Sequence, residues 1–147
     1  MYKNILVATD GSKLSMKAVD HALALAGAIG AKVTAFYAAP DYPMPAYADG
    51  VVYEPVSKKE YAKLAEQDAA KILDGVSARA KTAKVECDTK FTIASAPWEA
   101  IIAAAKKGKC DAIVMASHGR RGLSAVLLGS ETQKVLTHTK LPVIVVH

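Results

Sequence analysis

The chain has 147 residues and a net charge of +5, with 52% apolar and 22% charged residues. This size and composition are those of one globular domain, and they exclude a disordered chain. No apolar run approaches the ~20 residues that span a bilayer, and the N-terminal segment lacks the long apolar region and cleavage site of a signal peptide. We therefore expect one cytoplasmic domain over residues 1–147 that does not associate with a membrane.

Cysteine and lysine spacing argues against two further classes of protein. Cys87 and Cys110 have neither CxxC spacing nor a neighbouring His cluster, so we expect reduced thiols and no metal site. Because the lysine runs fall on separate predicted helices and helix ends, without aromatic residues between them, we expect a solvated surface and no nucleic-acid interface. These runs are Lys58-Lys59, Lys81 to Lys84 and Lys106 to Lys109.

Apolar runs and helical periods alternate along the first half of the chain. Lys3 to Thr9 predicts a strand, and apolar residues at steps of three and four predict a helix from Lys13 that Gly30 ends. Ala31 to Ala39 predicts a second strand. The segment from Pro40 to Pro55 is rich in Pro and Tyr, so we expect a surface loop there.

The second half continues this alternation and leads to a fold class. The predicted elements are a long amphipathic helix over Tyr61 to Ala80, a strand with one more exposed face over Val85 to Ala94, a helix from Pro97 to Lys107, a strand over Asp111 to Ala116, a helix from Ser124 to His138 and a strand over Leu141 to Val146. Nearly continuous apolar strands that alternate with helices indicate a parallel sheet covered on both faces. The sequence therefore predicts a single-domain α/β fold with five strands.

The loop after the first predicted strand carries residues that suit a ligand. In an open α/β sheet, ligands bind beyond the carboxyl ends of the strands, where the strand order reverses. Asp10 stands at such an end and can accept hydrogen bonds from a ribose or a base, while Gly11 lets the chain turn tightly. The alternative is that Asp10 or Ser12 only caps the following helix.

The loop after the fourth predicted strand is the second candidate. Met115 to Ser130 reads MASHGRRGLSAVLLGS. Gly119 and Gly122 let backbone N–H groups approach an anion, the two arginines attract negative charge, and the helix expected to contain Gly129 and Ser130 adds donors for phosphate oxygens. The alternative is a flexible connection with solvated arginines. Neither GxxxxGK[ST] nor a GxGxxG after the first strand is present.

Taken together, the ATDGS segment, the SHG-x9-GS pattern, the THTKLPVIVV ending and the element order resemble the universal stress protein family. In its ATP-binding branch the loop reads Gly-x2-Gly-x9-Gly-(Ser/Thr). Gly119, Gly129 and Ser130 fit that pattern, whereas its first glycine is Ala116 here. The resemblance implies an adenine nucleotide alpha hydrolase-like sheet in the order 3-2-1-4-5, helices on both faces, and ATP, with or without Mg²⁺, as the ligand.

The resemblance also assigns residues to that ligand. Thr9 and Asp10 would lie beside the nucleotide, with Asp10 near the adenine or ribose. The other contacts would be backbone groups of Ala38 to the adenine, Met115 and Ala116 beside the ribose and phosphates, and Gly119, Gly129 and Ser130 on the phosphate chain, with the Glu131 backbone nearby.

The preferred interpretation is a stress-response protein that binds ATP and passes its state to unidentified protein partners. The family implies a homodimer through the last strand, whose uncharged edge from Val143 to Val146 invites pairing, unless the loop from Pro40 to Pro55 covers it. Two alternatives stay open: a dimeric interaction module without nucleotide, which Ala116 in place of the first glycine keeps open, and a slow ATP-hydrolysing enzyme. His118 has no second group in the sequence to orient it, so we expect no catalytic residue and at most weak ATPase activity.

Overall fold

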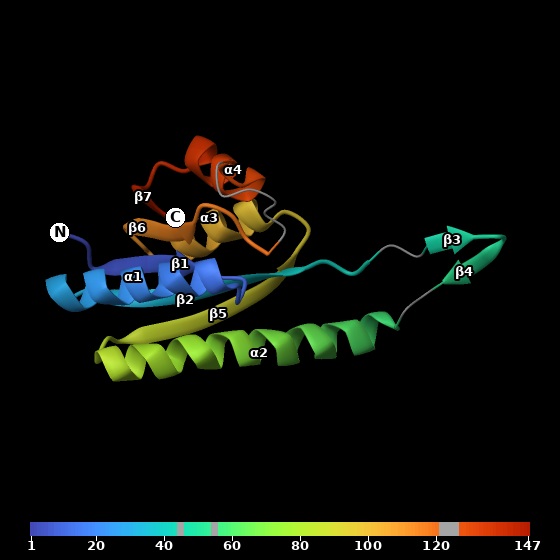
Figure 1. Ribbon diagram of the computed structural model, residues 1–147, viewed down its shortest axis with the longest axis horizontal. Helices are drawn as coiled ribbons and strands as arrows, with labels where there is room; N and C mark the ends of the chain where they lie inside the picture. Colours follow the sequence, from blue (N-terminus) through green and yellow to red (C-terminus); the bar gives the residue numbers. More distant parts are fainter. Residues whose placement is uncertain (44–45, 54–55, 121–126) are drawn as a thin grey trace.

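The computed structural model of the chain describes residues 1–43, 46–53, 56–120 and 127–147. Its elements are β1 (Asn4–Ala8), α1 (Lys13–Ile29), β2 (Lys32–Pro40), β3 (Ala46–Ala48), β4 (Val51–Tyr53), α2 (Lys58–Ala83), β5 (Cys87–Ala94), α3 (Pro97–Lys107), β6 (Ala112–Ala116), α4 (Ser130–His138) and β7 (Val143–Val146). Five strands form a parallel sheet in the order β5-β2-β1-β6-β7 (Figure 1). The predicted order 3-2-1-4-5 is therefore confirmed.

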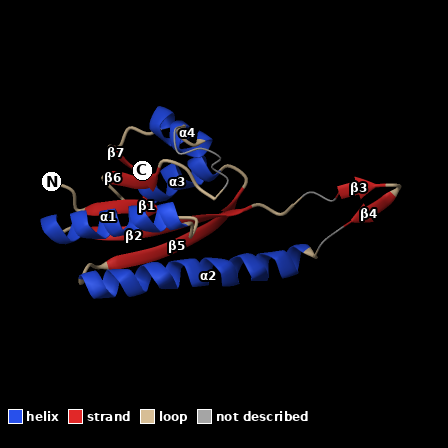
Figure 2. Cartoon of the chain, in the orientation of Figure 1, coloured by secondary structure: helices blue, strands red, loops and turns tan. Residues whose placement is uncertain are grey.

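Helices cover both faces of this sheet, which explains why its central strands are apolar throughout. Every residue of β1 is buried. Ile5 and Val7 pack in the cluster formed with α1 and α2, whereas Leu6 belongs to the cluster formed with α3 and α4. Figure 2 shows these helix pairs on opposite sides of the strands. Strands buried on both faces lose the alternation of polar and apolar residues, as the sequence indicated.

The ends of the two longer helices follow local chemistry. Ser12 caps α1 by accepting a hydrogen bond from the Ser15 N–H, and Gly30 ends that helix with φ of 72°. Ser57 and Glu60 form a reciprocal capping box at the start of α2. No helix among the described residues is long and apolar enough to cross a membrane.

The fourth helix begins later than the sequence predicts. It starts at Ser130 rather than Ser124; residues 127–129 are not helical, and residues 121–126 lie outside the described part. Gly129 is extended, with φ −60° and ψ 149°, because its N–H donates to the Ser117 carbonyl at 2.6 Å instead of continuing a helical ladder. Gly129 and Ser130 therefore stand at the start of α4, not within it.

The segment predicted as a loop from Pro40 to Pro55 contains a hairpin. Strands β3 and β4 pair antiparallel around Asp49 and Gly50, whose φ angles are 51° and 76°. Asp-Gly with two positive φ angles is the turn that suits the twist of a two-residue hairpin, and the prediction overlooked it. In Figure 1 the hairpin projects from the end of the domain far from β7, so it does not cover the edge of that strand.

Candidate functional site

The central strands β1 and β6 are neighbours, and the helices that follow them lie on opposite faces of the sheet. The strand order reverses between them, which is where open α/β sheets bind ligands. The loops after these two strands contain Asp10 and Gly119, and the structure brings those two residues together.

Thr9 fixes the turn after β1. It is 5% exposed, its hydroxyl oxygen accepts a hydrogen bond from the Gly11 N–H at 3.1 Å, and it lies 2.9 Å from the Ser15 hydroxyl. Gly11 has φ of +76°, a conformation that side chains rarely adopt. Thr9 therefore holds the turn from within, and its hydroxyl faces the protein.

Asp10 fastens the two loops to each other. One carboxylate oxygen accepts a hydrogen bond from the Ser12 N–H at 2.9 Å, and the other accepts from the Arg120 N–H at 2.8 Å. Burial acts to raise the pKa of Asp10, but hydrogen bonds from Ser12, Arg120 and Ser15 together lower it below 3.8. The ionised carboxylate is thus the form that holds this contact.

Gly119 is required by that contact. A Cβ atom at this position would stand 2.5 Å from the second oxygen of Asp10, closer than any real contact. The glycine that the sequence assigned to phosphate therefore has a role within the protein itself: it lets the Asp10 carboxylate reach the backbone of the second loop.

The start of α4 presents free backbone donors. Gly129 has no side chain to cap the helix, and its own N–H is used by Ser117. Within the described residues, the N–H groups of Ser130, Glu131 and Thr132 have no acceptor. Because a helix N-terminus carries partial positive charge, these three groups suit the oxygens of a phosphate.

Side chains of α4 lock this helix onto its surroundings. Glu131 accepts a hydrogen bond from the Trp98 N–H at 2.9 Å and so caps α3, whose own cap residue Ala96 offers no side-chain bond. The buried Thr132 hydroxyl donates to the Ala116 carbonyl at 2.9 Å. The sequence predicted a role for the Glu131 backbone alone. The contact of Thr132 could not be predicted, since a lone Thr in a helix gives no signal of a contact with a distant strand.

The side chains of the three remaining predicted residues pack in or against the core rather than into the crevice between the loops after β1 and β6. Met115 and Ala116 are 5% and 6% exposed, and their side chains enter the two core clusters on opposite faces. Ala38 is half-buried and packs against the α3 and α4 cluster. Ala116 is not among the described residues with positive φ, so alanine fits this position without strain, and its methyl group points into the core.

A broad cleft of about 940 Å³ opens beside the two loops. Its basic residues include Lys13, Lys17, Arg79 and Arg120, and Asp20 is paired with Arg79 at 2.6 Å. His118 also lines the cleft. Its Nδ1 lies 3.2 Å from the Ser117 hydroxyl, a partner that was not predicted from the sequence. In the described ranges, no three His, Cys, Asp or Glu side chains gather as a metal site.

Comparison with known proteins shows the family. The model of the universal stress protein family matches residues 1–147. Universal stress protein MJ0531 of Methanocaldococcus jannaschii is 32% identical over 146 residues, which cover 99% of this chain and 82% of that protein.

Solved structures of universal stress proteins are also similar to this chain. Universal stress protein UspA from Lactobacillus plantarum has a TM-score of 0.77 and 27% identity, covering 99% of this chain and 98% of that one. A universal stress protein solved in complex with cAMP has a TM-score of 0.70 and 28% identity, covering 99% and 97% of the two chains. The family match and the sequence identity lead to one conclusion: this chain belongs to the universal stress protein family.

Proposed function

We propose that this chain is a cytosolic stress-response protein that binds ATP between the loops after β1 and β6 and passes its bound state to partner proteins. The observation that carries the proposal is the row of N–H groups at Ser130, Glu131 and Thr132, which have no acceptor among the described residues and lie beside a loop held by Asp10. A related universal stress protein of the same fold was solved with cAMP, which supports an adenine nucleotide as the ligand class.

Each part of ATP has a matching group in this crevice. The phosphates would accept hydrogen bonds from the start of α4, and Arg120 and Lys13 of the neighbouring cleft would balance their charge. The ribose hydroxyls would donate to Asp10, and the Ala38 backbone would face the base. ATP supplies the negative charge that the helix N-terminus attracts. Mg²⁺ is compatible with this site through phosphate oxygens and Asp10.

Replacing Ser130 tests the phosphate contact with little disturbance of the fold. Proline at the first helical position removes one N–H, and the preceding Gly129 already has the extended dihedrals that proline requires. Losing one hydrogen bond to a charged group corresponds to roughly 1.5–3 kcal/mol, so Ser130→Pro should weaken ATP binding about 10- to 150-fold in calorimetry.

The matched control is Ser130→Ala, which removes the hydroxyl but keeps the N–H. It should change the affinity by less than about fivefold. If Ser130→Pro binds ATP as tightly as Ser130→Ala does, the phosphates do not rest on the start of α4.

One observation favours the second candidate, a dimeric interaction module without nucleotide. Both oxygens of Asp10 already accept hydrogen bonds from within the chain, so the two loops are held together without a ligand. Denaturing the purified protein and analysing the released small molecules separates the candidates. Release of an adenine nucleotide, or ATP binding by the stripped protein, supports the first candidate. If neither is observed, the second candidate is supported.

We also propose a homodimer through β7. Among the described strands, β7 pairs with β6 alone, and Ile144 on β7 is 37% exposed. An unpaired apolar edge favours pairing with another chain, and a two-fold axis would bring each β7 against its own copy. In such a dimer, nucleotide binding at the start of α4 could affect the second subunit, because β7 follows directly from α4 in the chain.

A further inference from the structure

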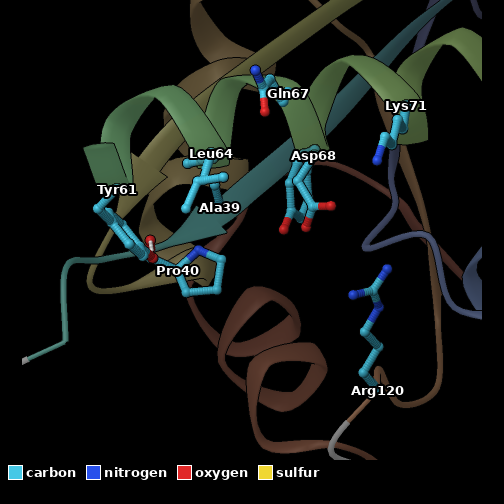
Figure 3. A pocket seen from close by; sticks show the side chains of 10 residues that line it. Ala39, Pro40, Tyr61, Leu64, Gln67, Asp68, Lys71 and Arg120 are labelled. Atoms are coloured by element: carbon cyan, nitrogen blue, oxygen red, sulfur yellow. Dashed lines mark hydrogen bonds between the residues drawn. The ribbon is translucent and has the colours of Figure 1, made fainter. Parts of the chain in front are cut away.

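A second, smaller cavity lies between the end of β2 and helix α2 (Figure 3). Its volume is about 410 Å³, within the range of sites for small molecules. One side is apolar, and the other carries hydrogen-bonding groups. The apolar side consists of Ala39, Pro40, Tyr61, Leu64 and Ala65, and the polar side of Tyr37, Gln67, Asp68, Lys71 and Arg120.

The polar groups of this cavity lack partners in the described part of the chain. Tyr37 is 5% exposed as a residue, and no hydrogen bond to another described residue occupies its hydroxyl. Burial raises the pKa of Tyr37, and the Asp68 carboxylate raises it further, so the phenol stays neutral as both donor and acceptor. No ion pair among the described residues uses Asp68, Lys71 or Arg120. No fully buried side-chain nitrogen or oxygen among the described residues lacks a partner, so the Tyr37 hydroxyl opens onto the cavity, where a polar ligand can bond to it.

Arg120 connects this cavity with the crevice of Asp10. Its N–H binds the Asp10 carboxylate, and one terminal nitrogen lies 2.9 Å from where a Cβ of Gly11 would stand. In Figure 3 its side chain rises from the loop toward α2, where Asp68 and Lys71 extend toward it. Arg120 lines both the small cavity and the broad cleft. A ligand whose ribose lies at Asp10 therefore has the small cavity beside it.

We infer that this cavity takes the base of the bound nucleotide and that Asp68 selects adenine by accepting a hydrogen bond from its exocyclic amino group. The inference rests on the proposed function and adds side-chain selection from α2 to the backbone contact at Ala38. A planar base matches the cavity because Tyr61, Leu64 and Pro40 offer an apolar wall to its face. The Tyr37 hydroxyl is available to a ring nitrogen, and the oxygens of the Asp68 carboxylate accept hydrogen bonds.

Two nucleotides that differ by one amino group test the selection. ATP and purine riboside triphosphate share the ribose, the phosphates and the purine ring, but only ATP carries the amino group. A hydrogen bond to a carboxylate predicts that the wild type binds ATP about 10-fold more tightly, or better. In Asp68→Ala this ratio should fall to about 1. The ratio is the readout because loss of a negative charge raises the affinity for both triphosphates together.

The matched control is Asp74→Ala, which removes the same charge from an exposed position of α2 that does not line the cavity. It should keep the wild-type ratio. Tyr37→Phe should weaken ATP roughly 2- to 10-fold, and the affinity for inorganic tripolyphosphate, which has no base, should stay unchanged.

The outcomes separate the inference from the proposed function. A collapsed ratio in Asp68→Ala alone supports the base cavity. A wild type that binds both triphosphates equally, or an Asp68→Ala variant that keeps the ratio, overturns the inference and leaves ATP binding in place. A wild type that binds neither triphosphate overturns both.

Discussion

The contact between Gly119 and Asp10 predicts that two substitutions in different loops depend on each other. A methyl group in Gly119→Ala would stand 2.5 Å from the Asp10 oxygen, so the carboxylate must move away. It then loses the hydrogen bond from the Arg120 N–H. Because this bond involves a charged group, we expect Gly119→Ala to lower the free energy of unfolding by about 2 kcal/mol. For a domain of this size, that is a fall in Tm of roughly 4–8 °C.

Asp10→Ala should destabilise the protein by a similar ~2 kcal/mol, since it removes the acceptor of the same bond. In that background the clash at Gly119 no longer exists. The double variant should therefore be only ~0.5 kcal/mol less stable than Asp10→Ala alone, which leaves a coupling energy of about 1.5 kcal/mol. Urea unfolding of the four proteins, followed by circular dichroism, measures these differences directly.

Asp20→Ala is the control for loss of an aspartate that pairs only at the surface. Its partner is Arg79, both side chains are exposed, and the expected cost is below ~1 kcal/mol. Additive effects of Gly119→Ala and Asp10→Ala would refute the reasoning, because they would mean that the glycine serves something other than the carboxylate.

Three further predictions follow from the same residues. The pKa of Asp10 is lower in the folded chain than its ordinary 3.8, so the stability difference between wild type and Asp10→Ala should be full above about pH 5 and shrink as the pH falls below 3.8. Urea titrations at pH 7 and pH 3 measure this difference, and an equal value at both pH values would contradict the prediction. Ala116→Gly should cost about 1 kcal/mol and leave ATP affinity unchanged in calorimetry, because the methyl group lies in the core; a large change in affinity would show that its side chain reaches the ligand. Ile144→Lys should shift the protein toward monomer in light scattering, whereas Ile29→Lys, at a similarly exposed position, should not; a wild type that is monomeric at micromolar concentration would remove the dimer.

The sheet was predictable because its signals are local. Four strands of the main sheet are short apolar runs, whereas β5 alternates polar and apolar residues. Each helix has its own period, so the alternation of strands and helices indicates parallel strands. The juxtaposition of the loops containing Asp10 and Gly119 was also within reach, because it follows from strand order. The first residue of α4 could not be predicted in this way. It is determined by the hydrogen bond from the Gly129 N–H to the Ser117 carbonyl, which joins two distant parts of one loop.

The small cavity could not be predicted from the sequence, for a different reason. Tyr37 lies in an apolar strand and resembles an ordinary core residue, while Asp68 and Lys71 resemble the solvated face of a helix. Only the packing of α2 over the end of β2, together with the loop that carries Arg120, brings these side chains to one cavity. Each residue separately has a structural explanation, so no pattern of spacing signals the group.

The hydrogen bonds at Asp10 determine how a ligand can bind between the two loops. A carboxylate has about four positions at which it accepts hydrogen bonds, and the two N–H groups of Ser12 and Arg120 use two of them. Ribose hydroxyls can therefore bind Asp10 without breaking the contact between the loops. The same carboxylate would then hold the empty site in shape and receive the ligand, so little free energy would be spent on ordering these loops when the ligand binds. On this reasoning, substitutions at Gly119 would weaken binding by displacing Asp10, even though no atom of Gly119 needs to contact the nucleotide.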